Sequence, residues 1–251
     1  MKLISFAKRP LMLMLYLCVA LFCHAELKAV LREPTDFFIF YSTSPGGEAL
    51  DGTGRNSPFA EAFLNNIQKN EPLNLLASDI VSDTLKLTGR RQRPSYNSQI
   101  INNKMFSIAN RSSSSKKYAL LIGNSNYQYL TKLKNAANDA QDIASVLLRL
   151  GYEVVLKTDA NLAVMESAIN SFTAKLKSEK ESEGFFWFAG QGMQLNGNNY
   201  LLPVNVNFSN DIQVRNSSFS FDQLIEELQW AGNKINVACI DTCFSAPSSD
   251  R

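Results

Sequence analysis

The stretch Gly184-Phe-Phe-Trp-Phe-Ala-Gly-Gln-Gly192 joins an apolar run to a glycine-rich turn. Four large apolar residues in succession, at 185–188, are typical of a strand buried on both faces of a sheet, and the glycines mark its end. Four other short apolar runs have turn signals on both sides and are also expected to be strands. They lie at 37–41, 118–122, 152–156 and 235–240.

Segments with helical periodicity lie between these runs. In residues 139–150 the apolar side chains repeat on one helical face, and Gly151 follows as a natural end. The other expected helices lie at 58–67, 75–87, 163–176 and 221–230. Strands that alternate with helices predict an α/β fold with a largely parallel sheet covered on both faces. Ligand sites in such sheets lie at the carboxyl ends of the strands, where Gln191 and Cys243 each follow an apolar run.

Residues 1–25 have the pattern of a secretory signal peptide. Lys2, Lys8 and Arg9 precede an apolar run at 11–22, and small residues before Glu26 offer a cleavage site. The alternative is a membrane anchor, but the run is shorter than the ~20 residues that a spanning helix needs. We therefore expect an exported protein, periplasmic or extracellular, without a stable membrane span.

Charge and cysteine content exclude several classes of partner. The formal net charge is +2, and cleavage after Ala25 removes three positive charges, leaving about −1, so no nucleic-acid or membrane-surface partner is expected. Cys239 and Cys243 remain in the mature chain, about 13 Å apart if both lie on one strand, which is too far for a disulfide. No Cys and His residues stand at ligand spacing, so neither a metal nor another cofactor is expected.

Residues 93–116 interrupt the pattern. They are polar and rich in turn-forming residues, with a serine run near their end, and they predict a linker. This linker would divide the mature chain into a smaller piece, 26–92, and a larger piece, 117–251.

The larger piece carries five strings that occur in the same order in one protein family. They are Lys117-Tyr-Ala-Leu-Leu-Ile-Gly-Asn124, Leu133-Lys-Asn-Ala-Ala-Asn-Asp-Ala140, Leu150-Gly-Tyr-Glu-Val-Val155, Gly184 to Gln194 with Asn199-Tyr-Leu-Leu-Pro-Val204, and Ile240-Asp-Thr-Cys243. This piece resembles the large subunit of the caspase and metacaspase superfamily of cysteine peptidases. Position 191 precedes position 243 by 52 residues, close to the ~50 between the two catalytic residues of caspases.

The smaller piece resembles the small subunit of bacterial caspase homologues, which in the family follows the cysteine. The matching strings are Thr35-Asp-Phe-Phe-Ile-Phe-Tyr-Ser-Thr-Ser-Pro-Gly46, Gly52-Thr-Gly-Arg-Asn-Ser-Pro-Phe59 and Thr88-Gly-Arg-Arg-Gln-Arg-Pro94. The resemblance therefore implies a caspase-like three-layer fold with a six-stranded sheet, circularly permuted. Residues 93–116 are long enough to cross about five strand spacings of ~4.8 Å, so the fold can close within one chain. A homodimer formed by segment swapping and a damaged gene that joins parts of two copies are the alternatives.

The resemblance also implies roles for single residues. Cys243 occupies the nucleophile position, and the backbone N–H groups of Gly192 and Cys243 would form the oxyanion hole. Asp139 and Asp241 match acids that line a pocket for a basic substrate residue. Asp51 stands where caspases have the arginine that receives a substrate aspartate, so a recognised peptide is expected to carry Arg or Lys. By themselves, Asp139 would be a helix N-cap, Asp241 a turn former and Cys243 a small buried residue.

One departure from the family governs the expected activity. Gln191 stands where the catalytic histidine should be, and the only histidine of the chain is His24, inside the expected signal peptide. A thiol with a pKa of about 8.5 needs a neighbouring base, and an amide cannot titrate. We therefore expect a pseudopeptidase that binds a protein or peptide with basic residues. The alternatives are an active endopeptidase with a proton acceptor from elsewhere, and a chain that never accumulates in folded form.

Overall fold

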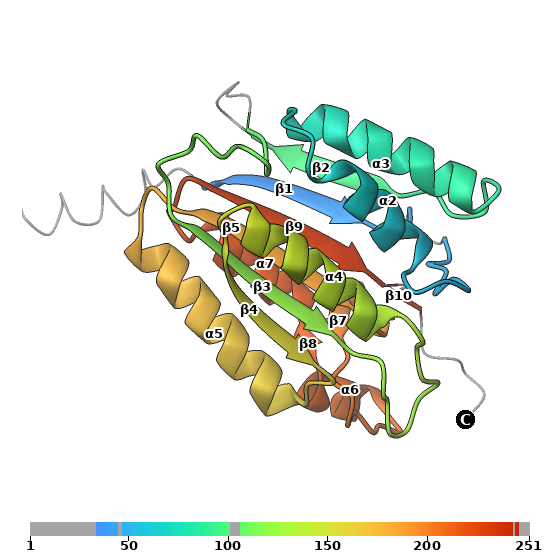
Figure 1. The fold of residues 1–251 in the computed structure, drawn as a ribbon. Coiled ribbons are helices and arrows are strands. Elements are labelled where there is room, and N and C mark those ends of the chain that lie inside the picture. Colours follow the sequence, from blue (N-terminus) through green and yellow to red (C-terminus); the bar gives the residue numbers. More distant parts are fainter. Residues whose placement is uncertain (1–33, 45–46, 101–105, 243, 246–251) are drawn as a thin grey trace, which may run out of the picture. The chain divides into compact units, whose positions relative to one another are not determined.

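Six strands form the main sheet in the order β2-β1-β9-β5-β3-β4 (Figure 1). They are β1 (Asp36–Tyr41), β2 (Ser95–Gln99), β3 (Lys117–Gly123), β4 (Glu153–Thr158), β5 (Glu183–Ala189) and β9 (Ile235–Asp241). All neighbours pair in parallel except β2, which is antiparallel to β1. This computed structural model describes residues 34–44, 47–100, 106–242 and 244–245. The five expected strands are all present, and the α/β prediction is confirmed.

The inner strands are apolar on both sides because helices cover both faces of the sheet. Every residue of β3, β5 and β9 is buried, whereas the edge strands β2 and β4 are mostly exposed. Along β5 the side chains alternate: Phe185 and Trp187 belong to one apolar cluster, and Phe186 and Phe188 belong to the cluster on the opposite face. The continuous apolar runs of the sequence are thus the mark of a sheet with two covered faces.

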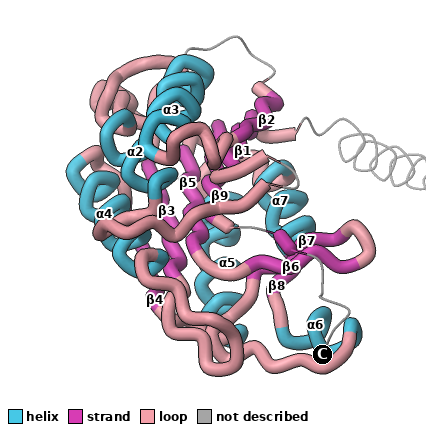
Figure 2. The backbone as a smooth tube through the Cα atoms, turned by 90° about the vertical axis from the view of Figure 1, so that its right-hand side faces the viewer, coloured by secondary structure: helices cyan, strands magenta, loops and turns pink. Residues whose placement is uncertain are grey.

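Two helical layers sandwich the sheet (Figure 2). The helices α2 (Pro58–Asn66), α3 (Leu73–Leu87) and α4 (Ala136–Arg149) cover one face, and α5 (Leu162–Ser178) and α7 (Phe221–Gln229) cover the other. Gly151, with φ of 86°, follows the end of α4 as the sequence predicts. The N-cap of α4 is Asn135 rather than Asp139, which lies buried in the first turn. A Cβ at Gly123 would meet the Ala136 carbonyl oxygen at 2.4 Å, so glycine lets this helix start close to the end of β3.

The two pieces of the chain meet in one sheet. β1 pairs with β9 over its whole length, from Asp36 opposite Ile235 to Tyr41 opposite Ile240. Their helices share a core as well, since the ring of Phe59 on α2 stacks on that of Trp187 on β5 with centroids 5.7 Å apart. The described residues of the ranges 35–92 and 117–242 therefore fold into one body within a single chain.

The segment 93–116 differs from the linker that its polarity predicts. Ser95–Gln99 form the edge strand β2, and the ring of Tyr96 stacks on Phe38 of β1 with centroids 5.4 Å apart. Farther along, Ile108 and Ala109 are buried in the core. An edge strand needs only one strand neighbour and tolerates polar side chains, which is why the sequence pattern did not reveal it.

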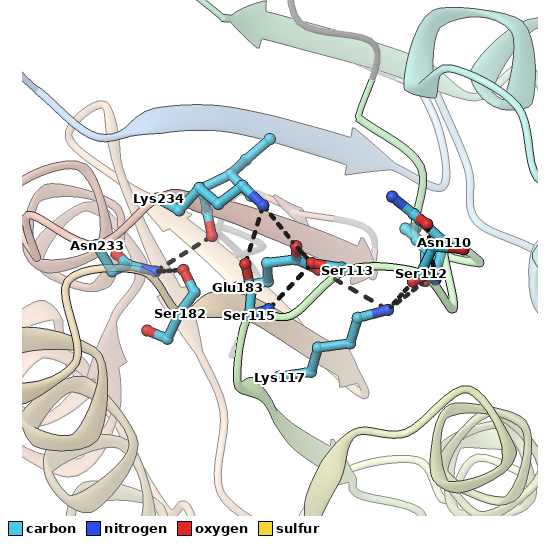
Figure 3. A network of polar contacts seen from close by, with 11 residues as sticks. Asn110, Ser112, Ser113, Ser115, Lys117, Ser182, Glu183, Asn233 and Lys234 are labelled. Atoms are coloured by element: carbon cyan, nitrogen blue, oxygen red, sulfur yellow. Dashed lines mark hydrogen bonds and ion pairs between the residues drawn. The ribbon is translucent and has the colours of Figure 1, made fainter.

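The chain then crosses the amino ends of the parallel strands to reach β3, and a polar network holds this crossing in place (Figure 3). Glu183, at the start of β5, is 2 % exposed and accepts hydrogen bonds from Ser113 Oγ at 2.7 Å and Lys234 Nζ at 3.0 Å. Lys117 Nζ lies 3.9 Å from the other carboxylate oxygen and donates to the Asn110 carbonyl at 2.6 Å. Burial lowers the pKa of Lys117, while Glu183 acts in the opposite direction.

A second, smaller sheet follows Gln191 in the chain. Its strands β6 (Gly192–Leu195), β7 (Asn198–Leu201), β8 (Phe219–Ser220) and β10 (Phe244–Ser245) have the order β10-β6-β7-β8. The short helix α6 (Asp211–Ser217) belongs to the same region. These elements are not evident in the sequence because each is too short to carry a clear period. Within the described part of the chain, the helices are too short or too polar to span a membrane.

Candidate functional site

The carboxyl ends of β5 and β9 meet at a small pocket of about 70 Å³. Its lining brings together four of the residues that the sequence singled out, although they are far apart in the chain. They are Asp51, Asp139, Gln191 and Asp241. The N–H of Gly190 donates to the carbonyl of Asp241 at 3.2 Å, which ties the two strand ends together. Cys243 lies outside the described residues, so the structure gives no position for the expected nucleophile.

Two buried carboxylates are bridged by one serine. Asp241 ends β9, Asp139 lies in the first turn of α4, and Ser57 caps the start of α2. The N–H of Ser57 donates to Asp139 Oδ1 at 3.0 Å, and its hydroxyl donates to Asp241 Oδ2 at 2.6 Å. The same hydroxyl accepts the N–H of Ala60 at 3.0 Å as the helix cap. One side chain therefore fixes a helix start and an acid pair at once.

Burial controls the protonation of this pair. Burial, together with the nearby charge of Asp241, raises the pKa of Asp139 to about 8. Burial also raises the pKa of Asp241 to about 6, although the hydrogen bond from Ser57 acts in the opposite direction. Two carboxylates in a site of low polarity cannot both ionise without a cation, so near neutral pH the pair retains a proton. A bound ammonium or guanidinium group would stabilise the doubly ionised form and release that proton.

Asp51 lies at the rim of the pocket and braces a loop. Its carboxylate accepts the backbone N–H groups of Lys134 at 2.6 Å and Asn135 at 3.1 Å. The Asn135 amide donates to the backbone carbonyl of Asp51 at 2.5 Å. Asp51 therefore positions the loop that precedes α4 while its negative charge stays near the acid pair.

Gln191 is held by its backbone and its side chain. Its N–H donates to the hydroxyl of Tyr127 at 2.7 Å, and its carbonyl accepts the N–H of Leu202 at 3.0 Å. The side-chain Nε2 donates to the carbonyl of Thr131 at 3.2 Å. The amide nitrogen has no lone pair available for a proton, so this side chain positions a loop and cannot act as a base.

The residues around Gln191 fit closely. A Cβ at Gly190 would lie 2.7 Å from the hydroxyl of Tyr127, which explains a glycine there. Tyr127 is buried, and burial raises its pKa. Gly192 begins β6 and lies between Leu201 of β7 and Phe244 of β10. Its role in an oxyanion hole, which requires Cys243, stays a prediction.

Ser57 and Tyr127 belong to the site and were not found in the sequence. The pair Ser57-Pro58 before an apolar run is a recognisable helix start, but nothing local shows that the hydroxyl reaches Asp241, which is 184 positions away in the chain. Tyr127 lies in a loop without periodicity. Among the described residues, no three His, Cys, Asp or Glu side chains group as metal ligands.

Comparison with known proteins identifies the family. The family model for the caspase domain matches residues 24–106 and 116–251. The chain belongs to the caspase-domain family. The α/β sheet with helices on both faces agrees with the caspase-like fold.

Two curated relatives match about half of this chain. Mucosa-associated lymphoid tissue lymphoma translocation protein 1 from Homo sapiens is 30% identical over 127 residues, which is 51% of this chain and 15% of that protein. Caspase-12 from Mus musculus is 28% identical over 118 residues, which is 47% of this chain and 28% of that protein. The chain thus spans less than a third of either relative. A crystal structure of a Geobacter sulfurreducens protein matches with 17% identity and a TM-score of 0.40, over 51% of this chain and 50% of that one.

Proposed function

We propose that this caspase-domain chain is a pseudopeptidase that binds a protein or peptide through a basic side chain. The observation that carries the proposal is Gln191, which follows the end of β5. Caspase-like peptidases have their catalytic histidine at the matching position. The side chain donates to the Thr131 carbonyl and cannot accept a proton. Positioned acid–base catalysis contributes typically ~10²–10⁴-fold, so its loss removes most of the turnover.

The acid pair supports binding of a basic group. Asp139 and Asp241 line a pocket together with Asp51, and all three are acidic. A cation that enters this pocket gains from two buried carboxylates that otherwise share a proton. We therefore assign Arg or Lys, rather than Asp, to the peptide residue that enters.

The alternative function is an active cysteine endopeptidase that cleaves after Arg or Lys. It needs a proton acceptor from a partner or from a carboxylate close to Cys243. Asp241 is two residues before that cysteine in the chain and has a raised pKa of about 6, so its carboxylate is the acceptor that this alternative would use near neutral pH. Ser57 donates to it and holds it within the pocket.

The arrangement of the chain is part of the proposal. We propose that the segments equivalent to the small and large subunits stand in exchanged order, as in a circular permutant. The parallel pairing of β1 with β9 within one sheet supports this, because it brings a strand of the first piece beside the last strand of the main sheet in the second piece. We also propose that residues 1–25 direct export, so that binding takes place in the periplasm or outside the cell.

Purified mature protein with fluorogenic peptides that place Arg or Lys before the scissile bond tests the reaction. We expect no hydrolysis that depends on Cys243. The variant Gln191→His should gain thiol-dependent hydrolysis, because it restores an imidazole of similar size at the end of β5. The matched controls are Gln191→Asn and the double variant Gln191→His/Cys243→Ala, and both should be inactive.

If the wild type hydrolyses these peptides and Cys243→Ala abolishes the hydrolysis, the chain is an active endopeptidase and the pseudopeptidase proposal is wrong. The binding part is tested separately with a labelled peptide that carries Arg. Its affinity for the wild type should fall at least about tenfold in Asp139→Asn, because truncating one partner of a buried charged site leaves the other group unpaired. Unchanged affinity would contradict the assignment of the pocket.

A further inference from the structure

The strand β4 is the last strand on one side of the main sheet (Figure 1). Its inner edge pairs with β3 over residues 153–158, and no other strand among the described residues pairs with its outer edge. Val155 and Leu156 in the middle of the strand are 37% and 36% exposed. An outer edge with free backbone groups and exposed apolar side chains is a template for another strand.

The two faces of β4 have different surroundings. Glu153, Val155 and Lys157 point to the α5 face, where they line a mostly apolar groove of about 520 Å³ between β4 and α5. Phe172 of α5 lines the same groove. Val154 packs on the opposite face, against the cluster that contains α4. One face of the strand therefore carries an acidic residue, a valine and a basic residue, in that order along the chain.

This order of charges is complementary to itself. In an antiparallel pair of β4 strands related by a two-fold axis at Val155, Glu153 of each copy lies opposite Lys157 of the other. Val155 then lies opposite Val155, and Val154 opposite Leu156. If one strand shifts by two residues, Glu153 lies opposite Asp159 or, for a shift in the other direction, opposite Val155. Within β4, only the register centred on Val155 therefore pairs Glu153 with Lys157.

We propose that the outer edge of β4 is the interface for a second copy of this chain. Antiparallel pairing there joins two six-stranded sheets into one continuous sheet and covers the exposed apolar residues of both edges. The partner is a second copy rather than an unrelated strand because the edge carries its own complement in charge. Glu153 already pairs with Lys175 of α5, an exposed ion pair that leaves the second carboxylate oxygen available to Lys157 of the other copy.

This dimer does not require any exchange of segments. β1 and β9 pair within one chain, so each copy is complete before association. The interface lies on the edge opposite β2 and away from the pocket at Asp139, and it is independent of whether the chain hydrolyses peptides.

Charge reversal with rescue tests the proposal. Sedimentation equilibrium of the full chain should show a dimer for the wild type. Lys157→Glu or Glu153→Lys alone places like charges opposite each other twice per dimer and should weaken association about tenfold or more. The double variant Glu153→Lys/Lys157→Glu restores opposite charges and should return association to near the wild-type value. A monomeric wild type, unaffected single variants or a double variant that stays weak would each overturn the proposal.

Cysteine cross-linking tests the position of the two-fold axis at Val155 without relying on the charged residues. In a chain whose Cys18, Cys23 and Cys243 are replaced by serine, Val155→Cys should form a disulfide between copies under mild oxidation, because the two residues face each other at the axis. Leu156→Cys, one residue along and facing Val154 of the other copy, should cross-link much more slowly. The matched control on the opposite edge is Asn97→Cys in β2. A cross-link from Asn97→Cys without one from Val155→Cys would place the interface elsewhere and overturn the proposal.

Discussion

Ser57, Asp139 and Asp241 show how single residues acquire a role through their neighbours. Each has an ordinary local explanation as a cap, a first-turn acid or a turn former. In the folded chain they form one hydrogen-bonded unit, with Ser57 donating through its N–H and its hydroxyl. This unit places two acids with raised pKa values in a pocket at the carboxyl ends of the strands.

The acid pair predicts how stability depends on pH. The folded-state pKa values of Asp139 and Asp241 exceed the unfolded value of 3.8, so between about pH 4 and pH 8 the folded state binds more protons than the unfolded state. The free energy of unfolding should therefore fall as pH rises through this window, by up to ~1.4 kcal/mol per pH unit for each proton. Urea unfolding at a series of pH values measures this slope.

Two variants test whether the acid pair causes this dependence of the free energy of unfolding on pH. Asp139→Asn removes one of the titrating groups and should flatten it. Asp142→Asn removes an acid of the same helix whose pKa is lowered by the hydrogen bond from Arg55, so it titrates below the window and should leave the slope unchanged. Equal slopes in both variants and the wild type would contradict the assignment.

At the scale of elements, the polar network at the amino ends of the parallel strands fixes the connection between the two pieces. Glu183, Lys117 and Lys234 come from the starts of three neighbouring strands or just before them, and they hold Ser113 and Asn110 of the crossing segment. Removing one member of a buried ionic group leaves an uncompensated charge, which is strongly destabilising. The crossing segment is thus anchored by charge as well as by the burial of Ile108 and Ala109.

We expect Glu183→Gln to lower the free energy of unfolding by about 3–5 kcal/mol, because Lys117 is left buried without its counter-charge. The control is Glu179→Gln, which removes an exposed partner of Lys116 and should cost less than about 1 kcal/mol. Chemical denaturation followed by circular dichroism measures both. Losses of equal size would show that the network contributes no more than a surface ion pair.

For the molecule as a whole, the two pieces of the chain share one hydrophobic core. Phe59 and Phe63 of the first piece pack on Trp187 of the second, with ring centroids 5.7 and 5.4 Å apart. A cluster that mixes side chains from both pieces should unfold as one cooperative unit.

Phe59→Ala should therefore destabilise the entire molecule by about 3–5 kcal/mol in a single transition. Trp187 fluorescence and far-UV circular dichroism should report the same midpoint. Tyr129→Ala, at a site that is 59% exposed, serves as the control and should change stability by less than about 0.5 kcal/mol. Two separate transitions in the wild type would show that the pieces fold independently.

The sequence by itself determined the inner strands and the main helices, because burial on two faces leaves an apolar run and burial on one face leaves a helical period. It also predicted that Gln191 and Cys243 follow the carboxyl ends of two parallel strands, and β5 and β9, which precede them, do end side by side. Only the tertiary structure decided that Ser57 joins Asp139 to Asp241, that a polar segment supplies β2, and that Tyr127 holds Gln191. These hydrogen bonds and this strand pairing join residues far apart in the chain and form only once the elements pack together, so no local pattern of side chains records them.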